Sequence, residues 1–400
     1  MDLFSGLISF WTGLVTSSLI IIQLFTASAS AYLTSLSSSL DSFLASYSTE
    51  TTSPPLSSPQ DTSTHSNTTT PSTTVASTTT ASNATTTQKT IAQKPAAAQP
   101  VASAPAPTQK TPLTPLLPPE QVNTAARASI VNILCMVQSS GSLRSISGSG
   151  VIIDARGVIL TNAHIGQYFL LRDYPTKDSV SCVVRTGSPA TPAYSAALLY
   201  LPLAWINENA SQISAEQALG TGENDYAFLH ITGPINPQAA LPAAFSNIAM
   251  SGSSLDTGDQ VLVAGYPAGF LDAITIERNL YATSAFTAIG QLYTFDSPTT
   301  IDVVSLGGTV VSQGGSSGGA VVRTYDGKLA GLISTATTGT TTASRDLRAI
   351  TIGYINRSLT QAGKGGLVEF LSGDLVTIAA NFASTLFVEE KKKLVEALSR

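Results

Sequence analysis

Short apolar or alternating runs fill the chain from about residue 120 onward, and turn-forming residues (Gly, Asp, Asn, Ser or Pro) bound each run. Runs of this length and period predict β-strands rather than helices. The predicted strands are Ile130–Val137, Gly148–Ile153, Val158–Thr161, Val180–Arg185, Tyr226–Ile231, Gln260–Ala264, Thr300–Val304, Gly319–Val322, Lys328–Ser334 and Ala349–Tyr354. Many short strands with few helical stretches between them indicate an all-β barrel or sandwich.

The last segment, Asp374–Ser399, has a different pattern, because its apolar residues recur at helical spacing. Asp374 is suited to cap the start of this helix, and Glu389 and Lys393 form a favourable pair four residues apart. We expect one C-terminal helix here.

Residues 3–40 contain no charged side chain, and Leu3–Phe25 is mostly apolar. A stretch this long can cross a bilayer as a helix, and the small residues Ala27–Ala31 fit a signal-peptidase site. No Lys or Arg precedes Lys89, so basic flanks give no orientation. We expect export and membrane contact through this segment, either as a retained anchor or as a cleaved signal.

The next part of the chain is too polar to bury a core. Ser and Thr make up more than half of Ser48–Thr90, and Ile91–Pro119 is rich in Ala, Pro and Gln. Such composition predicts a disordered linker. The predicted organisation is a hydrophobic signal or anchor segment at 1–33, a linker at 34–119, one folded domain at 120–365 and a helical segment at 366–400.

Charge and composition exclude several classes of protein. The chain has 20 Lys and Arg against 25 Asp and Glu, a net charge of -5, and one short basic cluster, Lys391–Lys393. This balance argues against a nucleic-acid partner. Three His and two Cys without metal-ligand spacing argue against a metal site, so we expect no metal and no cofactor.

Three segments carry the residues of a serine-hydrolase triad. They are Val158–His164, Glu223–Leu229 and Gly314–Ala320, and they place His164, Asp225 and Ser317 in one of the chain orders in which the triad recurs. A serine hydroxyl needs a neighbouring base, an imidazole can take and return a proton near neutral pH, and a carboxylate fixes the tautomer of that imidazole. Glycines around the serine allow its backbone N–H groups to face a developing oxyanion.

These residues resemble a known family. Thr161–His164, Asn224–Leu229 and Gly315–Gly319 are similar to the signature segments of trypsin-like (chymotrypsin-fold) serine proteases, with most similarity to the high-temperature-requirement A (HtrA, or Deg) branch. Leu329–Ser334 is similar to the strand that lines the substrate cleft, and Ile352–Tyr354 more weakly to the back of the specificity pocket. The resemblance covers about residues 125–360.

The resemblance implies two antiparallel six-stranded β-barrels with the site between them. His164 and Asp225 would come from the first barrel and Ser317 from the second, and the N–H groups of Gly315 and Ser317 would form the oxyanion hole. The Ser334 hydroxyl would support Asp225. The segment after the domain is too short for the PDZ domain that many relatives carry, which leaves peptide-gated activation and cage assembly in doubt.

The sequence contains other candidates for the nucleophilic serine and the basic histidine. Ser316 also lies in a Gly-x-Ser-x-Gly frame, but the family's serine is followed by two glycines, which selects Ser317. An α/β-hydrolase requires a histidine after the serine, and no histidine follows His230. His65 lies in the predicted linker, and alternation points His230 to the opposite face from Asp225. His164 is therefore the expected base.

The predicted substrate pocket has no carboxylate. Its expected lining is Val311, Ser312, Ser334, Thr335, Ala336 and Gly353, which favours small or medium apolar side chains of the substrate. Cys135 and Cys182 are either two small buried residues or, as export favours, a disulfide.

The sequence thus predicts an exported serine endopeptidase, membrane-anchored or secreted and most consistent with a bacterial cell envelope, that acts on polypeptides in protein quality control or processing. Two alternatives are a catalytically silent protease-fold module that binds unfolded polypeptide, and a stalked surface adhesin. The sequence does not predict the oligomeric state.

Overall fold

The computed structural model of the protein describes residues 116–138, 143–215 and 220–399. The predicted hydrophobic segment at 1–33 and nearly all of the predicted linker at 34–119 lie outside the described residues. The division of the chain into four segments therefore stays a prediction. Of the helices in the described residues, none combines the length and the apolar character that crossing a bilayer requires.

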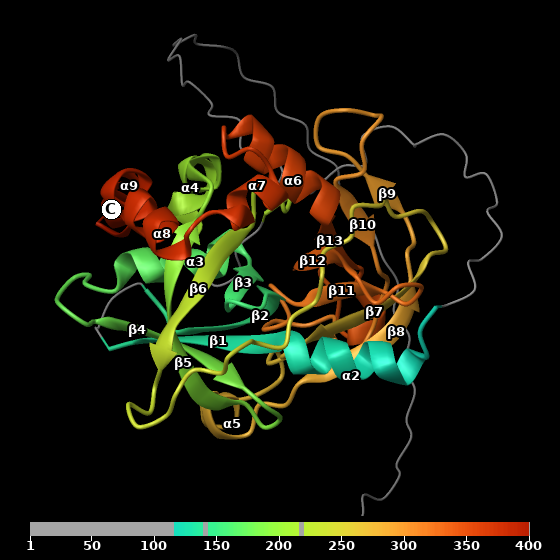
Figure 1. Cartoon of the computed structure of the whole chain (residues 1–400), viewed down its shortest axis with the longest axis horizontal. Helices are drawn as coiled ribbons and strands as arrows, with labels where there is room; N and C mark the ends of the chain where they lie inside the picture. Colours follow the sequence, from blue (N-terminus) through green and yellow to red (C-terminus); the bar gives the residue numbers. More distant parts are fainter. Residues whose placement is uncertain (1–115, 139–142, 216–219, 400) are drawn as a thin grey trace, which may run out of the picture. The chain divides into compact units, whose positions relative to one another are not determined.

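The first half of the described chain forms a closed barrel of six antiparallel strands in the order β1-β2-β3-β6-β5-β4 (Figure 1). The strands are β1 (Ile130–Val137), β2 (Ile146–Asp154), β3 (Val158–Thr161), β4 (Val180–Thr186), β5 (Thr191–Tyr200) and β6 (Ala227–Pro234). Ile133, Leu160 and Phe228 are fully buried in the core of the barrel. Five of the six strands were predicted. The sixth, β5, was missed because Pro192 and small residues fill its exposed first half.

The second half forms a seven-stranded antiparallel sheet in the order β8-β7-β11-β12-β13-β10-β9, coloured orange in Figure 1. Its strands are β7 (Gln260–Gly265), β8 (Thr283–Ala288), β9 (Leu292–Tyr293), β10 (Val303–Ser305), β11 (Ala320–Arg323), β12 (Leu329–Ala336) and β13 (Leu347–Thr351). In place of the expected second six-stranded barrel, the structure has this seven-stranded sheet.

The two edge strands of this sheet, β8 and β9, are consecutive in the chain and are separated by Ile289–Gln291 alone. Ile289 N donates to Asp259 O at 2.9 Å on one side of the sheet, and Gly290 N donates to Ser305 O at 2.8 Å on the other. β8 and β9 are therefore two parts of one bent segment, in which β8 pairs with β7 and β9 pairs with β10. The sheet curls back on itself, and the bend divides one strand into β8 and β9.

Helix α2 (Pro119–Ser129) leads directly into β1 and lies against the second sheet (Figure 1). Arg127 Nη1 donates to Ala282 O at 2.9 Å, and Ser284 Oγ donates to Asn123 Oδ1 at 2.7 Å. The sequence analysis did not predict this helix, although Pro119 at its first position is a typical start signal. Helix α2 ties the first barrel to the second sheet.

Helix α6 (Ile352–Gln361) begins where β13 ends, so the predicted strand Ala349–Tyr354 is wrong in its second half. The Thr351 side chain accepts a hydrogen bond from Tyr354 N at 3.0 Å and so caps the helix. Residues 352–354 therefore belong to the first turn of a helix and leave the sheet.

The predicted helix Asp374–Ser399 is two helices, α8 (Leu375–Ser384) and α9 (Leu386–Leu398), which follow α7 (Leu367–Ser372). Asp374 caps α8 as predicted, by accepting from Thr377 N at 2.8 Å. The break follows from the Thr385 and Ser384 hydroxyls, which donate to Asn381 O at 2.6 Å and 3.1 Å and compete with the helical backbone bonds. The remaining helices are α3 (Ala163–Gly166), α4 (Leu203–Asn209) and α5 (Ala273–Arg278), with 3-10 turns η1 (Gln167–Leu171), η2 (Ala210–Gln212) and η3 (Thr342–Ser344).

Cys135 on β1 and Cys182 on β4 occupy directly paired positions of neighbouring strands and form a disulfide. Of the two alternatives that the sequence left open, the bridge is the one present. Cys135 is fully buried, so the bond also forms part of the core of the first barrel.

Removing this bridge should destabilise the protein. The bond joins residues 47 positions apart, and closing a loop of that length is worth about 4 kcal/mol in the chain-entropy account. We expect urea denaturation of a Cys135→Ala, Cys182→Ala variant to give a free energy of unfolding lower by about that amount. Reduced wild-type protein is the matched control, since it loses the bond and keeps both side chains. A variant as stable as the oxidised wild type would contradict the prediction.

Candidate active site

His164 stands on the short helix α3 immediately after β3. Asn162 Nδ2 donates to Asp225 O at 2.8 Å, and Gln167 Nε2 donates to His164 O at 3.0 Å. These bonds fix the backbone around His164 to the segment just before β6 and to the 3-10 turn that follows α3. The His164 side chain remains 21% exposed, so part of the imidazole is open to solvent.

The imidazole of His164 is paired with the carboxylate of Asp225. His164 Nδ1 lies 3.0 Å from Asp225 Oδ2 and 3.2 Å from Oδ1, and His164 N donates to Asp225 Oδ1 at 3.0 Å. Because a carboxylate only accepts hydrogen bonds, Nδ1 carries the proton. The opposite nitrogen, Nε2, is then free to accept a proton from another group.

Asp225 is buried, and the structure keeps it ionised. Burial alone works to raise the pKa of Asp225, but the nearby His164 and the hydrogen bonds from His164 and Ser334 outweigh it, so the pKa lies below its ordinary value. A carboxylate charged at all ordinary pH values can orient the imidazole and stabilise its protonated form.

Ser334, on β12 of the second sheet, joins this pair to the candidate nucleophile. Its hydroxyl donates to Asp225 Oδ2 at 2.8 Å, as the family resemblance implies, and its carbonyl oxygen accepts from Ser317 Oγ at 3.3 Å. The structure therefore brings His164, Asp225, Ser334 and Ser317 together at the junction of barrel and sheet. Within the described residues, Ser317 Oγ makes no hydrogen bond to His164. Such contacts are often long before substrate binds.

Ser316 and Ser317 differ in their surroundings. Ser317 is half-buried, whereas Ser316 is fully buried and its Oγ has no hydrogen-bond partner in the described part of the chain. A hydroxyl enclosed in this way is closed to a substrate.

Two peptide groups before and at Ser317 leave their N–H groups available. A trans peptide points its carbonyl and its N–H in opposite directions. Gly314 O accepts from Ala268 N at 2.7 Å, and Ser316 O accepts from Gly319 N at 2.9 Å, so the N–H groups of Gly315 and Ser317 point away from these bonds. Neither N–H donates to another group among the described residues. Gly315 has φ +88°, and a Cβ there would lie 2.6 Å from Tyr266 O, so only glycine fits.

Ser149, on β2 of the first barrel, holds the loop that contains Gly315 and Ser317, and it was not among the predicted site residues. Its Oγ donates to Gly315 O at 2.7 Å and accepts from Tyr266 N at 2.8 Å, and its N–H donates to Ser317 O at 2.7 Å. The sequence signal for Ser149 was its position between two glycines, Gly148 and Gly150. In the structure, other side chains pack closely against both glycines and leave no room for a Cβ.

The predicted pocket residues differ in burial and belong to different elements. Val311 is fully buried in the core of the second sheet, and Ser312 is buried with its Oγ bonded to Thr309 N at 2.9 Å. Thr335 and Ala336 lie at the more exposed end of β12. Gly353 lies in the first turn of α6, directly after β13 (Leu347–Thr351), which pairs with β12.

A positive charge lies beside the predicted floor of the pocket. Arg345 Nη1 donates to Ser312 O at 3.4 Å, its Nε donates to Gly339 O at 3.0 Å, and its guanidinium lies 5.3 Å from the centre of the Phe270 ring. The prediction of a neutral pocket did not foresee this residue, because Arg345 lies outside every motif. Within the described residues, no three His, Cys, Asp or Glu side chains form a group that could hold a metal ion.

Of three comparisons with known proteins, the match to a family model agrees with the motifs. Residues 148–332 match the family described as the trypsin-like peptidase domain. Among solved structures, the active form of the Rv3671c protease from M. tuberculosis matches with 21% sequence identity and a TM-score of 0.36, over 65% of this chain and 95% of that chain. Among curated proteins, no sequence matches this chain.

Proposed function

We propose that the chain is a serine endopeptidase with Ser317 as nucleophile, His164 as general base and Asp225 as the group that orients His164. The match of residues 148–332 to the trypsin-like peptidase domain supports this proposal. The observation that carries this proposal is the double role of Ser334. One residue of the second sheet binds the Asp225 carboxylate through its hydroxyl and the Ser317 hydroxyl through its carbonyl.

In the proposed reaction, Ser317 Oγ attacks the carbonyl carbon of the scissile peptide while His164 Nε2 takes the hydroxyl proton. The oxyanion that forms is bound by the N–H groups of Gly315 and Ser317. His164 then gives its proton to the leaving amine, and an acyl group remains on Ser317. Water, deprotonated by His164, hydrolyses this ester and restores the serine. No step requires a cofactor.

From its present hydrogen bond to Ser334 O, Ser317 Oγ must turn toward His164 before it can react. A rotation about the Cα–Cβ bond suffices for this change, because hydroxyl side chains of serine move between staggered rotamers. The resting bond therefore holds the nucleophile beside its base without blocking the reaction.

We also propose that the enzyme acts on polypeptides outside the cytoplasm, as a membrane-anchored or secreted protein of a bacterial cell envelope, in quality control or processing. The apolar segment Leu3–Phe25 and the Cys135–Cys182 disulfide support this setting, since disulfides persist in oxidising compartments. The membrane contact would be made by the N-terminal segment.

A fluorophosphonate probe tests the proposed activity, because it reacts with an activated serine and leaves ordinary serines untouched. We expect rapid labelling of the folded wild-type protein and labelling slower by at least about 10³-fold in a His164→Ala variant, which lacks the base. Folded wild-type protein that the probe leaves unmodified would reject the enzyme and favour the silent peptide-binding module.

A further inference from the structure

Asn224, which immediately precedes Asp225, has an unusual backbone. Its φ is +55°, in the left-handed region that residues other than glycine seldom adopt. Asparagine tolerates this region better than most residues, but the conformation persists only where the surroundings enforce it. The position of Asp225 therefore depends on what holds Asn224.

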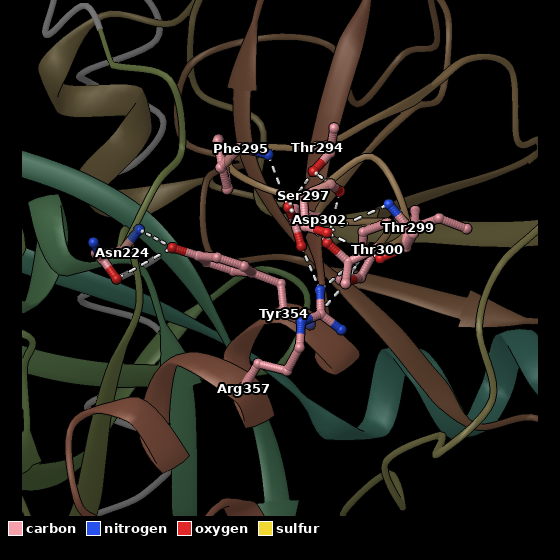
Figure 2. A network of polar contacts seen from close by, with 11 residues as sticks. Asn224, Thr294, Phe295, Ser297, Thr299, Thr300, Asp302, Tyr354 and Arg357 are labelled. Atoms are coloured by element: carbon pink, nitrogen blue, oxygen red, sulfur yellow. Dashed lines mark hydrogen bonds and ion pairs between the residues drawn. The ribbon is translucent and has the colours of Figure 1, made fainter. Parts of the chain in front are cut away.

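Two hydroxyl groups of helix α6, those of Tyr354 and Ser358, hold Asn224, and Figure 2 shows the bonds from Tyr354. Tyr354 Oη accepts from Asn224 N at 2.9 Å and donates to Asn224 Oδ1 at 3.1 Å. Ser358 Oγ donates to the same Oδ1 at 3.0 Å. The backbone and the side chain of Asn224 are thus both bound to one helix.

The residue on the other side of Asp225 is held by the same helix. Tyr226 Oη donates to Ser358 Oγ at 2.9 Å, and the Tyr226 side chain is fully buried. Each hydroxyl in this chain of bonds has an acceptor for its proton, and the chain runs from Tyr226 through Ser358 to Asn224. Asp225 is therefore flanked on both sides by residues fastened to α6.

The two tyrosines remain hydrogen-bond donors at any pH where a protease of this kind works. Burial raises the pKa of Tyr354 and that of Tyr226 above the ordinary value of a tyrosine. Neither hydroxyl therefore loses its proton, and the bonds around Asn224 do not change with pH.

Helix α6 is itself anchored to the second sheet. It continues from β13, and Arg357, one turn after Tyr354, forms an ion pair with the buried Asp302 (Figure 2). The Tyr354 ring packs edge-on against Phe295, with ring centres 4.9 Å apart. Helix α6 thus contacts the second sheet on one side and, on the other, the segment of the first barrel that bears Asp225.

We propose that Tyr354 and Ser358 are positioning residues for the proposed triad: by holding Asn224 in its left-handed conformation and Tyr226 in place, they aim the Asp225 carboxylate at His164. The inference rests on the proposed function. It adds a second set of contacts from the second half of the fold to the segment that bears Asp225, beside the bond from Ser334 to Asp225.

The test is a Tyr354→Phe variant, which keeps the ring against Phe295 and removes the hydroxyl. Two quantities are measured: the rate constant and the half-saturation concentration for inactivation by a fluorophosphonate, and the downfield ¹H NMR resonance of the His164 Nδ1 proton. We expect the rate constant to fall about tenfold, as for the loss of a hydrogen bond to a part-buried group, with the half-saturation concentration unchanged. The proton resonance should move upfield or broaden. Ser358→Ala should change both in the same direction by less, which gives a second reading if Tyr354→Phe folds poorly.

Arg357→Lys is the matched control, because it disturbs the same helix through Asp302 and does not touch Asn224. This control should leave the rate constant and the resonance near the wild-type values. Equal effects in Tyr354→Phe and Arg357→Lys, or an unchanged resonance in both Tyr354→Phe and Ser358→Ala, would overturn the inference. If the probe does not label wild-type protein, the proposed enzyme fails, while the resonance still decides whether α6 positions Asp225.

Discussion

Replacing Ser317 with alanine should abolish both fluorophosphonate labelling and the hydrolysis of casein. The variant Ser317→Ala lacks the hydroxyl that donates to Ser334 O, the residue whose own hydroxyl binds Asp225. Loss of the nucleophile from a serine-protease triad lowers turnover by roughly 10⁵–10⁶-fold. The fold should be unaffected, since Ser317 Oγ makes a single hydrogen bond at 3.3 Å.

Ser316→Ala is the matched control. The Ser316 hydroxyl is buried without a partner among the described residues, and removing such a group costs little or stabilises the fold. We expect its casein hydrolysis to stay within about tenfold of wild type and its melting temperature to stay equal or rise. Labelling that survives in Ser317→Ala, or that disappears in Ser316→Ala while the fold is intact, would show that the nucleophile has been assigned to the wrong serine.

The second large effect concerns Glu390, on the C-terminal helix α9. Its side chain is fully buried, and neither carboxyl oxygen has a hydrogen-bond partner in the described part of the chain. Burial, assisted by the neighbouring Glu389, raises the pKa of Glu390 to about 8, from an ordinary value of 4.5. Its charge also acts on the buried Tyr200 of β5, whose own pKa burial raises to about 12. At neutral pH, Glu390 is therefore mostly protonated.

This shift makes the stability of the protein fall as pH rises. Between pH 4.5 and 8 the folded chain keeps a proton on Glu390 that the unfolded chain has released, so raising the pH favours unfolding. Each pH unit in this window removes up to about 1.4 kcal/mol, and the loss across it approaches about 5 kcal/mol. Glu390→Gln, which cannot ionise, should remove this pH dependence.

The measurement is the free energy of unfolding in urea at pH 5 and at pH 9. Wild type and Glu390→Gln should be similar at pH 5, and the variant should be the more stable protein by a few kcal/mol at pH 9. Glu396→Gln, an exposed position on the same helix, is the control and should follow wild type. Equal pH dependence in Glu390→Gln and wild type would mean that Glu390 is not the group responsible.

The strands that could be predicted from the sequence are those whose apolar residues form an uninterrupted run. β1 and β3 were predicted to the residue, because the hydrophobic pattern alone defines a strand buried on both faces. β5 and β8 were missed, because small and polar residues occupy much of each and their pairing partners, distant in sequence, decide their conformation. The predicted strand Ala349–Tyr354 is wrong in its second half, because Thr351 caps a helix inside this apolar stretch.

The candidate site shows the same division. The structure brings together His164, Asp225 and Ser334, which short motifs could identify, and places Ser317 next to them. Ser149, Tyr354 and Arg345 act through contacts between segments that are distant in the sequence, and local patterns do not reveal such contacts. The pocket prediction relied on position along the chain, whereas packing decides the direction of each side chain. Val311, for example, lies in the core of the second sheet.

The order in which the site is assembled has a consequence for the newly made chain. Ser334, Tyr354 and Ser358 bind the region of Asp225 from positions 109 to 134 residues further along the sequence. A chain still being synthesised can complete the first barrel before these partners arrive. On the proposed mechanism, proteolytic capacity therefore appears only after α6 has formed. A chain ended at Thr351, which contains all three proposed catalytic residues, should accordingly react with the probe much more slowly than the full chain. Equal rates would show that the late-arriving helix is not needed.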